Sequence, residues 1–190
     1  ILQIEYSTKA AKVLSIYLNL YRTVVGVKCK DGVILGAERL VFSKLLDKKP
    51  TEEYTMLTEA SVWSSAVKSL TEDMHELCQK LSKQILQGFY VPISGRTLSD
   101  RLSLYLNAYT LYNAVRPFGS SEIIASYSKD EGFGLYMLEP SGLYYGYSCC
   151  TAGKGRQTAK AQFEKIDFSK LTCKEALFYV AKMYEFFYLA

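Results

Sequence analysis

The sequence is poor in the residues on which most hydrolytic and metal sites depend. Its 190 residues contain one histidine, His75, and five cysteines without any Cys-x-x-Cys spacing, and no Gly-x-Ser-x-Gly segment is present. A Ser-His-Asp or Cys-His site would have to use His75, and a zinc site needs clustered Cys and His ligands. We therefore expect neither a serine or cysteine hydrolase nor a metal site, and we favour a surface or helix-packing role for His75.

Strong charge and long apolar runs are also missing. Lys and Arg outnumber Asp and Glu by 23 to 19, which gives a net charge of +4. So small an excess, without a basic run or a basic–aromatic ladder, argues against nucleic-acid binding. No stretch approaches the roughly 20 apolar residues of a membrane-spanning helix. The composition therefore predicts one globular domain, residues 1–190, that binds neither nucleic acid nor membrane.

Cysteine and tyrosine usage point to a reducing compartment and to extensive packing surfaces. We interpret the cysteines as reduced thiols of a cytosolic-type protein. The adjacent Cys149 and Cys150 allow a redox feature, but two small residues in a buried strand is the interpretation we favour. The 16 tyrosines combine an apolar ring with a polar tip, which suits subunit interfaces as well as cores.

Hydrophobic periodicity predicts helices and strands in alternating blocks. Strands are expected within 22–40, 54–67, 121–128, 134–139 and 143–150, and helices within 3–13, 70–88, 97–115, 153–165 and 172–189. The order is helix, strands, two helices, strands, two helices. Two antiparallel sheets built from hairpins, with helices outside them, is the simplest layered arrangement of these elements.

Several local signals refine this outline. Thr97 with Asp100, and Thr172 with Glu175, have the spacing of capping boxes at helix starts. The segment TAGKGRQT looks faintly like a phosphate-binding loop, but its glycines do not have the spacing G-x-x-x-x-G-K-[ST]. We therefore expect no nucleotide and no other cofactor.

The segment with the clearest chemical interest is the hairpin within 22–40. Thr23 heads its first strand, Asp31-Gly32 predicts the turn because both residues tolerate positive φ, and Glu38 stands near the end of the second strand. An N-terminal-threonine hydrolase carries its nucleophilic hydroxyl and a free α-amine on one residue, because the amine relays the proton. Thr23 is internal, so its nitrogen is an amide unless the chain is cleaved after Arg22.

Three stretches resemble the α-type subunits of the 20S proteasome. These are LQIEYSTKAAK at 2–12, VGVKCKDGVILGAERLVFSKL at 25–45, and the block 105–165, within which AVRPFG and EPSG are the most specific segments. The stretches 13–21 and 46–69 depart from the family pattern, through divergence or through omitted residues. The resemblance implies an N-terminal-nucleophile hydrolase-like fold of class α+β, a four-layer αββα sandwich of two antiparallel sheets flanked by helices.

The resemblance also implies a subunit without catalytic activity. The family spacing places the nucleophile at Arg22, the catalytic acid at Glu38, and the catalytic lysine near Glu53 or Tyr54, so no position carries the required residue. The implied role is a structural and gating subunit, in the cytoplasm and nucleus. Its implied partners are the other α subunits of a heptameric ring, the β subunits, and a regulatory particle or other activators. The alternative is a catalytically active, β-type threonine hydrolase.

Two further positions gain a role only through this resemblance. Tyr6 matches a tyrosine that supports the entry gate, although an ordinary buried helix tyrosine is the alternative. Glu53 falls where the family places a lysine that pairs with the carboxylate of an activator tail. Because carboxylates repel one another, the sequence predicts a weak tail pocket, unless Lys48 or Lys49 takes the place of that lysine.

Overall fold

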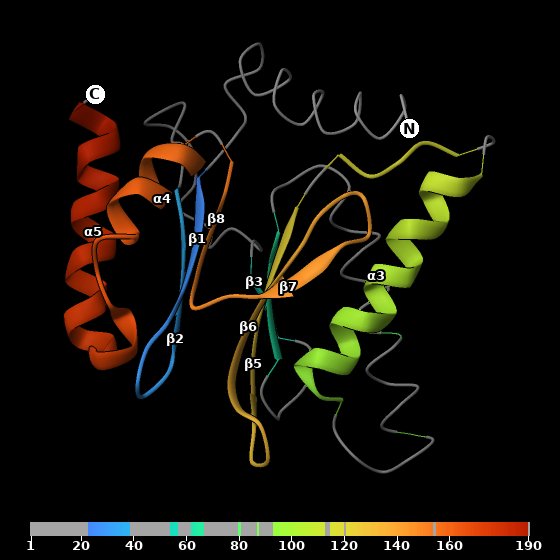
Figure 1. Cartoon of the computed structure of the whole chain (residues 1–190), viewed down its shortest axis with the longest axis horizontal. Helices are drawn as coiled ribbons and strands as arrows, with labels where there is room; N and C mark the ends of the chain where they lie inside the picture. The colour runs from blue at the N-terminus through green and yellow to red at the C-terminus, as the bar shows by residue number, and fades with distance from the viewer. Residues whose placement is uncertain are drawn as a thin grey trace, which may run out of the picture.

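The computed structural model describes residues 23–38, 54–56, 62–66, 80, 87, 93–112, 115–119, 121–153 and 155–189. These residues form four layers (Figure 1), in which a helix covers a five-stranded sheet, and that sheet packs on a three-stranded sheet covered by further helices. The α+β sandwich of two antiparallel sheets flanked by helices is thus confirmed. No helix in the described part of the chain is long and apolar enough to cross a bilayer.

The three-stranded sheet carries the opening hairpin. Its antiparallel strands, in spatial order, are β2 (Val33–Ala37), β1 (Val24–Lys28) and β8 (Cys149–Ala152). Val25 and Val27 point to the helices, whereas Val24 points to the other sheet. Because β1 is covered on both faces, it reads as a nearly continuous apolar run rather than as an alternating one.

The five-stranded sheet forms the second inner layer. All its neighbours are antiparallel, in the order β3 (Tyr54–Met56), β4 (Val62–Ala66), β5 (Glu122–Ser128), β6 (Gly132–Leu138) and β7 (Tyr144–Gly146). Ile123 and Leu135 face the three-stranded sheet, and Ile124 and Leu138 face the covering helix. This alternation is the period of two that strands impose.

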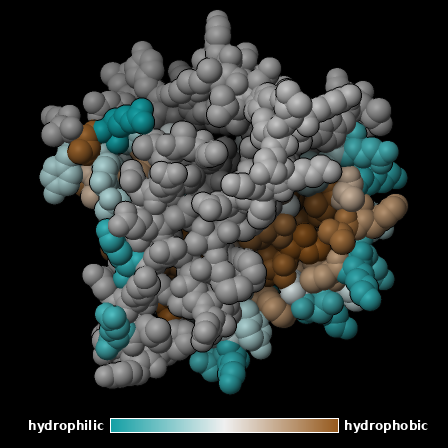
Figure 2. All heavy atoms as spheres, turned by 180° about the vertical axis from the view of Figure 1, so that it is seen from behind, coloured by the Kyte–Doolittle hydropathy of each residue, from teal (hydrophilic) through white to brown (hydrophobic). Residues whose placement is uncertain are grey.

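The outer layers are helical. The five-stranded sheet is covered by α3 (Gly95–Leu111), and the three-stranded sheet by α4 (Arg156–Phe163), the short 3₁₀ helix η1 (Phe168–Lys170) and α5 (Cys173–Leu189). Leu98, Leu102 and Leu106 recur every four residues and form the buried stripe of α3. Seen from behind, apolar side chains gather on the side that carries the three-stranded sheet (Figure 2), where every residue of β2 is only half-buried.

Several sequence predictions hold in detail. The hairpin 139–143 turns at Gly142, whose φ is +85°, with the Gly142 amide donating to the Glu139 carbonyl at 2.9 Å. The capping box of α5 is present, because the Thr172 amide donates to Glu175 Oε2 at 2.9 Å and the Glu175 amide to Thr172 Oγ1 at 3.5 Å. The helix expected at 3–13 lies outside the described residues.

Other predictions need correction. The helix expected from Thr97 begins at Gly95, because Ser94 rather than Thr97 is its N-cap and accepts the Thr97 amide at 3.2 Å; it ends at Leu111, before the expected Val115. The strand expected at 143–150 is two strands, since the Tyr147 amide donates to β6 while Ser148 accepts from Lys28 of β1. The chain therefore passes from one sheet to the other between Tyr147 and Ser148.

The hairpin turn of β1 and β2 also differs from expectation. Gly32 is not among the glycines with positive φ in the described residues, so the turn does not use that conformational freedom. Instead, Asp31 Oδ1 accepts the backbone amide of Cys173 at 2.8 Å, and the Lys30 amide donates to the Leu171 carbonyl at 3.1 Å. Contacts with the start of α5 therefore shape this turn.

Candidate functional site

The threonine of the opening hairpin, Thr23, lies at the head of β1, one residue after Arg22, where the family spacing places the nucleophile. Thr23 is 2% exposed, and its backbone amide donates to Glu38 Oε2 at 3.2 Å. Because Val24 pairs with Ala37, Glu38 follows β2 directly beside Thr23, and its own amide donates to the Thr23 carbonyl at 3.1 Å. Glu38 thus closes the open end of the hairpin through its side chain as well as its backbone.

The Thr23 hydroxyl is held by the segment that follows β8. That strand ends at Ala152, which pairs with Val24, and the chain then turns at Gly153, whose φ is +99°. This turn brings the Gly155 amide to Thr23 Oγ1, to which it donates at 3.2 Å. In a phosphate-binding loop such a backbone N–H would donate to a ligand. Here the Gly155 N–H donates to the buried Thr23 hydroxyl instead.

A third element reaches the same residue from α5. The Tyr184 hydroxyl donates to the Thr23 carbonyl at 3.1 Å, so the amide, carbonyl and hydroxyl of Thr23 all have partners. A threonine nucleophile needs a base to accept its proton. The nitrogen here is a donating peptide amide, and the group that meets the hydroxyl is another peptide amide rather than a Lys or His side chain. Among the residues that the structure describes, the contacts of Thr23 support folding, and none of them supplies a base for its hydroxyl proton.

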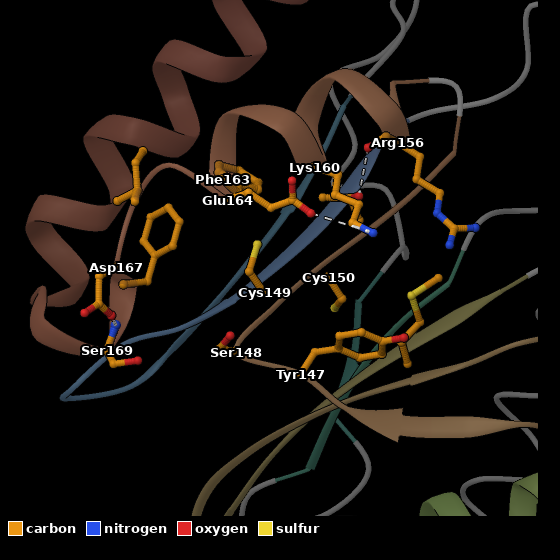
Figure 3. A pocket seen from close by; sticks show the side chains of 14 residues that line it. Tyr147, Ser148, Cys149, Cys150, Arg156, Lys160, Phe163, Glu164, Asp167 and Ser169 are labelled. Carbon is orange, nitrogen blue, oxygen red and sulfur yellow. Dashed lines mark hydrogen bonds and ion pairs between the residues drawn. The ribbon is translucent and has the colours of Figure 1, made fainter.

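A hollow of about 380 Å³ lies beside β8, under α4 and η1 (Figure 3). Cys149 and Cys150 line it, and both are free thiols in a strand, as the sequence led us to expect. Burial raises the pKa of Cys149 to about 12 and raises the pKa of Cys150 as well, so neither is a thiolate at neutral pH. The hollow therefore contains no activated nucleophile among its described residues.

Three charged residues that line this hollow, Lys160, Glu164 and Asp167, take part in ion pairs. Lys160 and Glu164 form an exposed ion pair at 3.8 Å, and Asp167 pairs with Lys170 at 2.9 Å. The Lys170 side chain lowers the pKa of Asp167. No group of three or more His, Cys, Asp or Glu side chains in the described ranges is placed to hold a metal ion.

The structure places only part of the site predicted from sequence. Glu38 lies beside Thr23, whereas Tyr6, Arg22, Glu53 and the single histidine all lie outside the described residues. The roles proposed for those positions stay predictions.

Sequence reasoning missed Gly155 and Tyr184. They lie 132 and 161 residues from Thr23 along the chain, and no local pattern connects positions so far apart. The turn at Gly153 was not predicted either, because TAGKGRQT was considered only as a phosphate-binding loop and residues 153–165 were expected to be helical, whereas α4 begins at Arg156.

Comparison with known proteins identifies the family to which the sequence is similar. Residues 21–183 match the family described as "Proteasome subunit". Proteasome subunit alpha type-3 of Oryza sativa subsp. japonica is 39% identical over 188 residues, which cover 96% of this chain and 71% of the relative.

Other relatives agree. Proteasome subunit alpha type-3 of Arabidopsis thaliana is 37% identical over the same shares of both chains. The probable proteasome subunit alpha type-7 of Schizosaccharomyces pombe is 37% identical over 92% of this chain and 66% of its own length. The segments ERLVFSKL, VRPFG and GKGRQTAK favour the same type 3, or seventh-position, α subunit. This chain belongs to the proteasome subunit family.

Proposed function

We propose that this chain is a non-catalytic, α-type subunit of a 20S proteasome core particle. In this role it forms part of the wall of an α ring, helps to control substrate entry, and docks activators during ubiquitin-dependent protein degradation. The three relatives named above are all α-type subunits, which supports the placement. The expected location is the cytoplasm and nucleus, where such particles would meet their substrates.

The observation that carries the proposal is the bonding of Thr23. A β-type threonine hydrolase needs a free α-amine at its nucleophile. Thr23, the threonine next to the position that the family spacing gives to the nucleophile, has a peptide amide that donates to Glu38, and its hydroxyl accepts from Gly155. Activation would require cleavage before Thr23 and removal of its carbonyl and hydroxyl contacts with α5 and the α4 turn, so the β-type alternative is disfavoured.

The gating part of the proposal depends on residues outside the described ranges. Tyr6→Ala should change the rate at which peptides enter assembled particles, while Glu53→Lys should strengthen the binding of an activator tail by replacing a repulsive carboxylate with an attractive ammonium. Unchanged entry in intact particles, or unchanged tail affinity, would remove the corresponding residue from the proposal.

Assembly is tested by native mass spectrometry of particles purified through an affinity tag on this chain. We expect the chain in a large hetero-oligomer with other α-type and β-type subunits, and peptidase activity that co-purifies with the assembly. Recombinant chain alone, treated identically, is the control and should cleave no peptide. A tagged chain that is recovered only as a monomer or homo-oligomer with peptidase activity of its own would overturn the proposal.

A further inference from the structure

Thiols from separate parts of the chain meet where the opening hairpin touches α5. Cys29 follows β1 and is 4% exposed, whereas Cys173 is the first residue of α5 and is half-buried. Cys29 belongs to the core between the three-stranded sheet and its helices, and Cys173 packs against that core. Although 144 positions separate them in sequence, the two side chains pack in one cluster: burial raises the pKa of the Cys29 thiol, and the nearby Cys173 side chain opposes that rise.

The surrounding backbone holds this pair in place. The Lys30 amide donates to Leu171 at 3.1 Å, and the Cys173 amide donates to Asp31 Oδ1 at 2.8 Å. Gly32 leaves room for the second thiol, because a Cβ at that position would lie 2.9 Å from Cys173 Sγ. These contacts place the Cys173 thiol beside the hairpin turn that follows Cys29.

We propose that Cys29 and Cys173 form an oxidation site, which a peroxide converts into a disulfide that links the opening hairpin covalently to α5. The half-buried Cys173 reacts first. Its thiol loses a proton, the thiolate attacks one peroxide oxygen, and the O–O bond breaks to give a sulfenic acid and hydroxide, which takes up that proton to become water. The Cys29 sulfur then attacks the Cys173 sulfur, the S–O bond breaks, and the hydroxyl leaves as water with the Cys29 proton. Two thiols and one peroxide thus give one disulfide and two waters.

Asp31 restrains the first step. Burial, and next the hydrogen bond from Cys173 to the Asp31 side chain, raise the pKa of the Cys173 thiol to about 12. Since the thiolate is the reactive species, oxidation is slow at neutral pH and accelerates as the pH rises. The substitution Asp31→Asn keeps an oxygen that can accept the Cys173 amide but removes the negative charge, so it should accelerate disulfide formation.

The other described cysteines supply internal controls. Cys149 faces the same helical layer, and burial keeps its pKa near 12. Cys150 stands on the opposite face of β8, in the core between the sheets. Cys149 lies on the strand next to β1 and is close enough to Cys29 for the two thiols to interact electrostatically, so it is the competing partner, and the proposal requires that Cys29 joins Cys173 and not Cys149.

The test treats the soluble full chain with hydrogen peroxide at neutral pH, blocks the remaining thiols by alkylation, and maps peptides without reduction. We expect a Cys29–Cys173 peptide pair that is lighter by two hydrogens than its free thiols and that separates on reduction. Asp31→Asn should form it several-fold faster, Cys173→Ser should not form it, and Cys150→Ser should behave as the parent chain.

Several results would overturn the proposal. One is terminal oxidation of Cys173 while Cys29 stays free in a folded chain. Others are a disulfide that uses Cys149 or Cys150 instead, or an Asp31→Asn chain that oxidises no faster than the parent. Circular dichroism of each variant before oxidation separates a true chemical effect from loss of folding.

Discussion

Two polar residues, Thr23 and Glu122, are equally buried but differ in their hydrogen bonding. Each is 2% exposed. Thr23 uses its amide, carbonyl and hydroxyl in hydrogen bonds to Glu38, Tyr184 and Gly155. Glu122 leaves its Oε1 without a hydrogen-bond partner among the described residues.

The difference shows that partners, rather than burial, decide what a polar group costs the fold. A paired buried group contributes about 1 kcal/mol, whereas an unpaired one carries its full desolvation penalty. Glu122 stands on the face of β5 that carries Ile124, toward the core beneath α3. Burial raises the pKa of its carboxyl to about 7, so the fold avoids the charge by keeping the proton.

The largest expected effect comes from titrating Glu122. Its pKa in the folded chain, about 7, lies above the unfolded value of 4.5. Stability from the bound proton is therefore complete below the unfolded value and is lost as the pH rises through 7. Between pH 5 and pH 8, the free energy of unfolding should fall by about 2–3 kcal/mol, as measured by urea denaturation.

Glu122→Gln cannot lose a proton and should flatten this part of the profile. Glu131→Gln makes the same charge change in an exposed turn and should leave the decline in place. If the parent chain is equally stable at both pH values, or if Glu122→Gln keeps the full decline, the carboxyl is not the isolated buried acid described here.

A smaller effect should follow from removing the hydroxyl of Thr23. Thr23→Val keeps the shape of the side chain but leaves the Gly155 amide without its acceptor, which should lower the free energy of unfolding by about 1–2 kcal/mol. Thr158→Val, the same change at an exposed position of α4, is the matched control. Equal losses in the two variants would mean that the buried hydrogen bond contributes nothing specific.

Removing the Tyr184 hydroxyl should cost about 1 kcal/mol. Tyr184→Phe deletes the donor to the Thr23 carbonyl and leaves the aromatic ring in place. Tyr179, on another face of the same helix, is 39% exposed, so Tyr179→Phe should change the thermal midpoint much less. A larger loss of stability from Tyr179→Phe than from Tyr184→Phe would contradict the claim that the hydrogen bond to Thr23 stabilises the fold.

The smallest effect on the free energy of unfolding is expected for an ion pair whose two side chains are exposed to solvent. Lys160 and Glu164 lie 3.8 Å apart on α4, with about two thirds of each side chain exposed to solvent. Water screens such pairs, so Lys160→Gln should change the free energy of unfolding by less than about 0.5 kcal/mol. A loss comparable to that of Thr23→Val would show that partners matter as much in solvent as in the core.

The sequence predicted those features that depend on neighbouring residues. The hairpin of β1 and β2, the turn at Gly142 and the capping box of α5 each depend on a few adjacent side chains. The boundary between β7 and β8 was missed because YYGYSCC is uniformly suited to a strand, and only pairing with two different sheets divides it.

The sequence predicted that Thr23 lacks the free amine of a nucleophile, but it did not predict which residues contact Thr23. That Thr23 is internal follows from the sequence, and so does the absence of a free amine. That Gly155 and Tyr184 occupy its remaining groups depends on how layers distant in sequence pack together. The sequence did not predict the burial of Glu122 either, because a single acidic residue at the start of an apolar strand normally indicates an exposed strand end.

The central claim is that Thr23 supports the fold and performs no chemistry. The most direct test treats assembled particles that contain this chain with a threonine-reactive covalent inhibitor and measures the mass of each separated subunit. The account predicts adducts on catalytic subunits of the particle, and an unmodified chain in which Thr23 is still joined to Arg22. A stoichiometric adduct on Thr23, together with a new N-terminus at that residue, would contradict it.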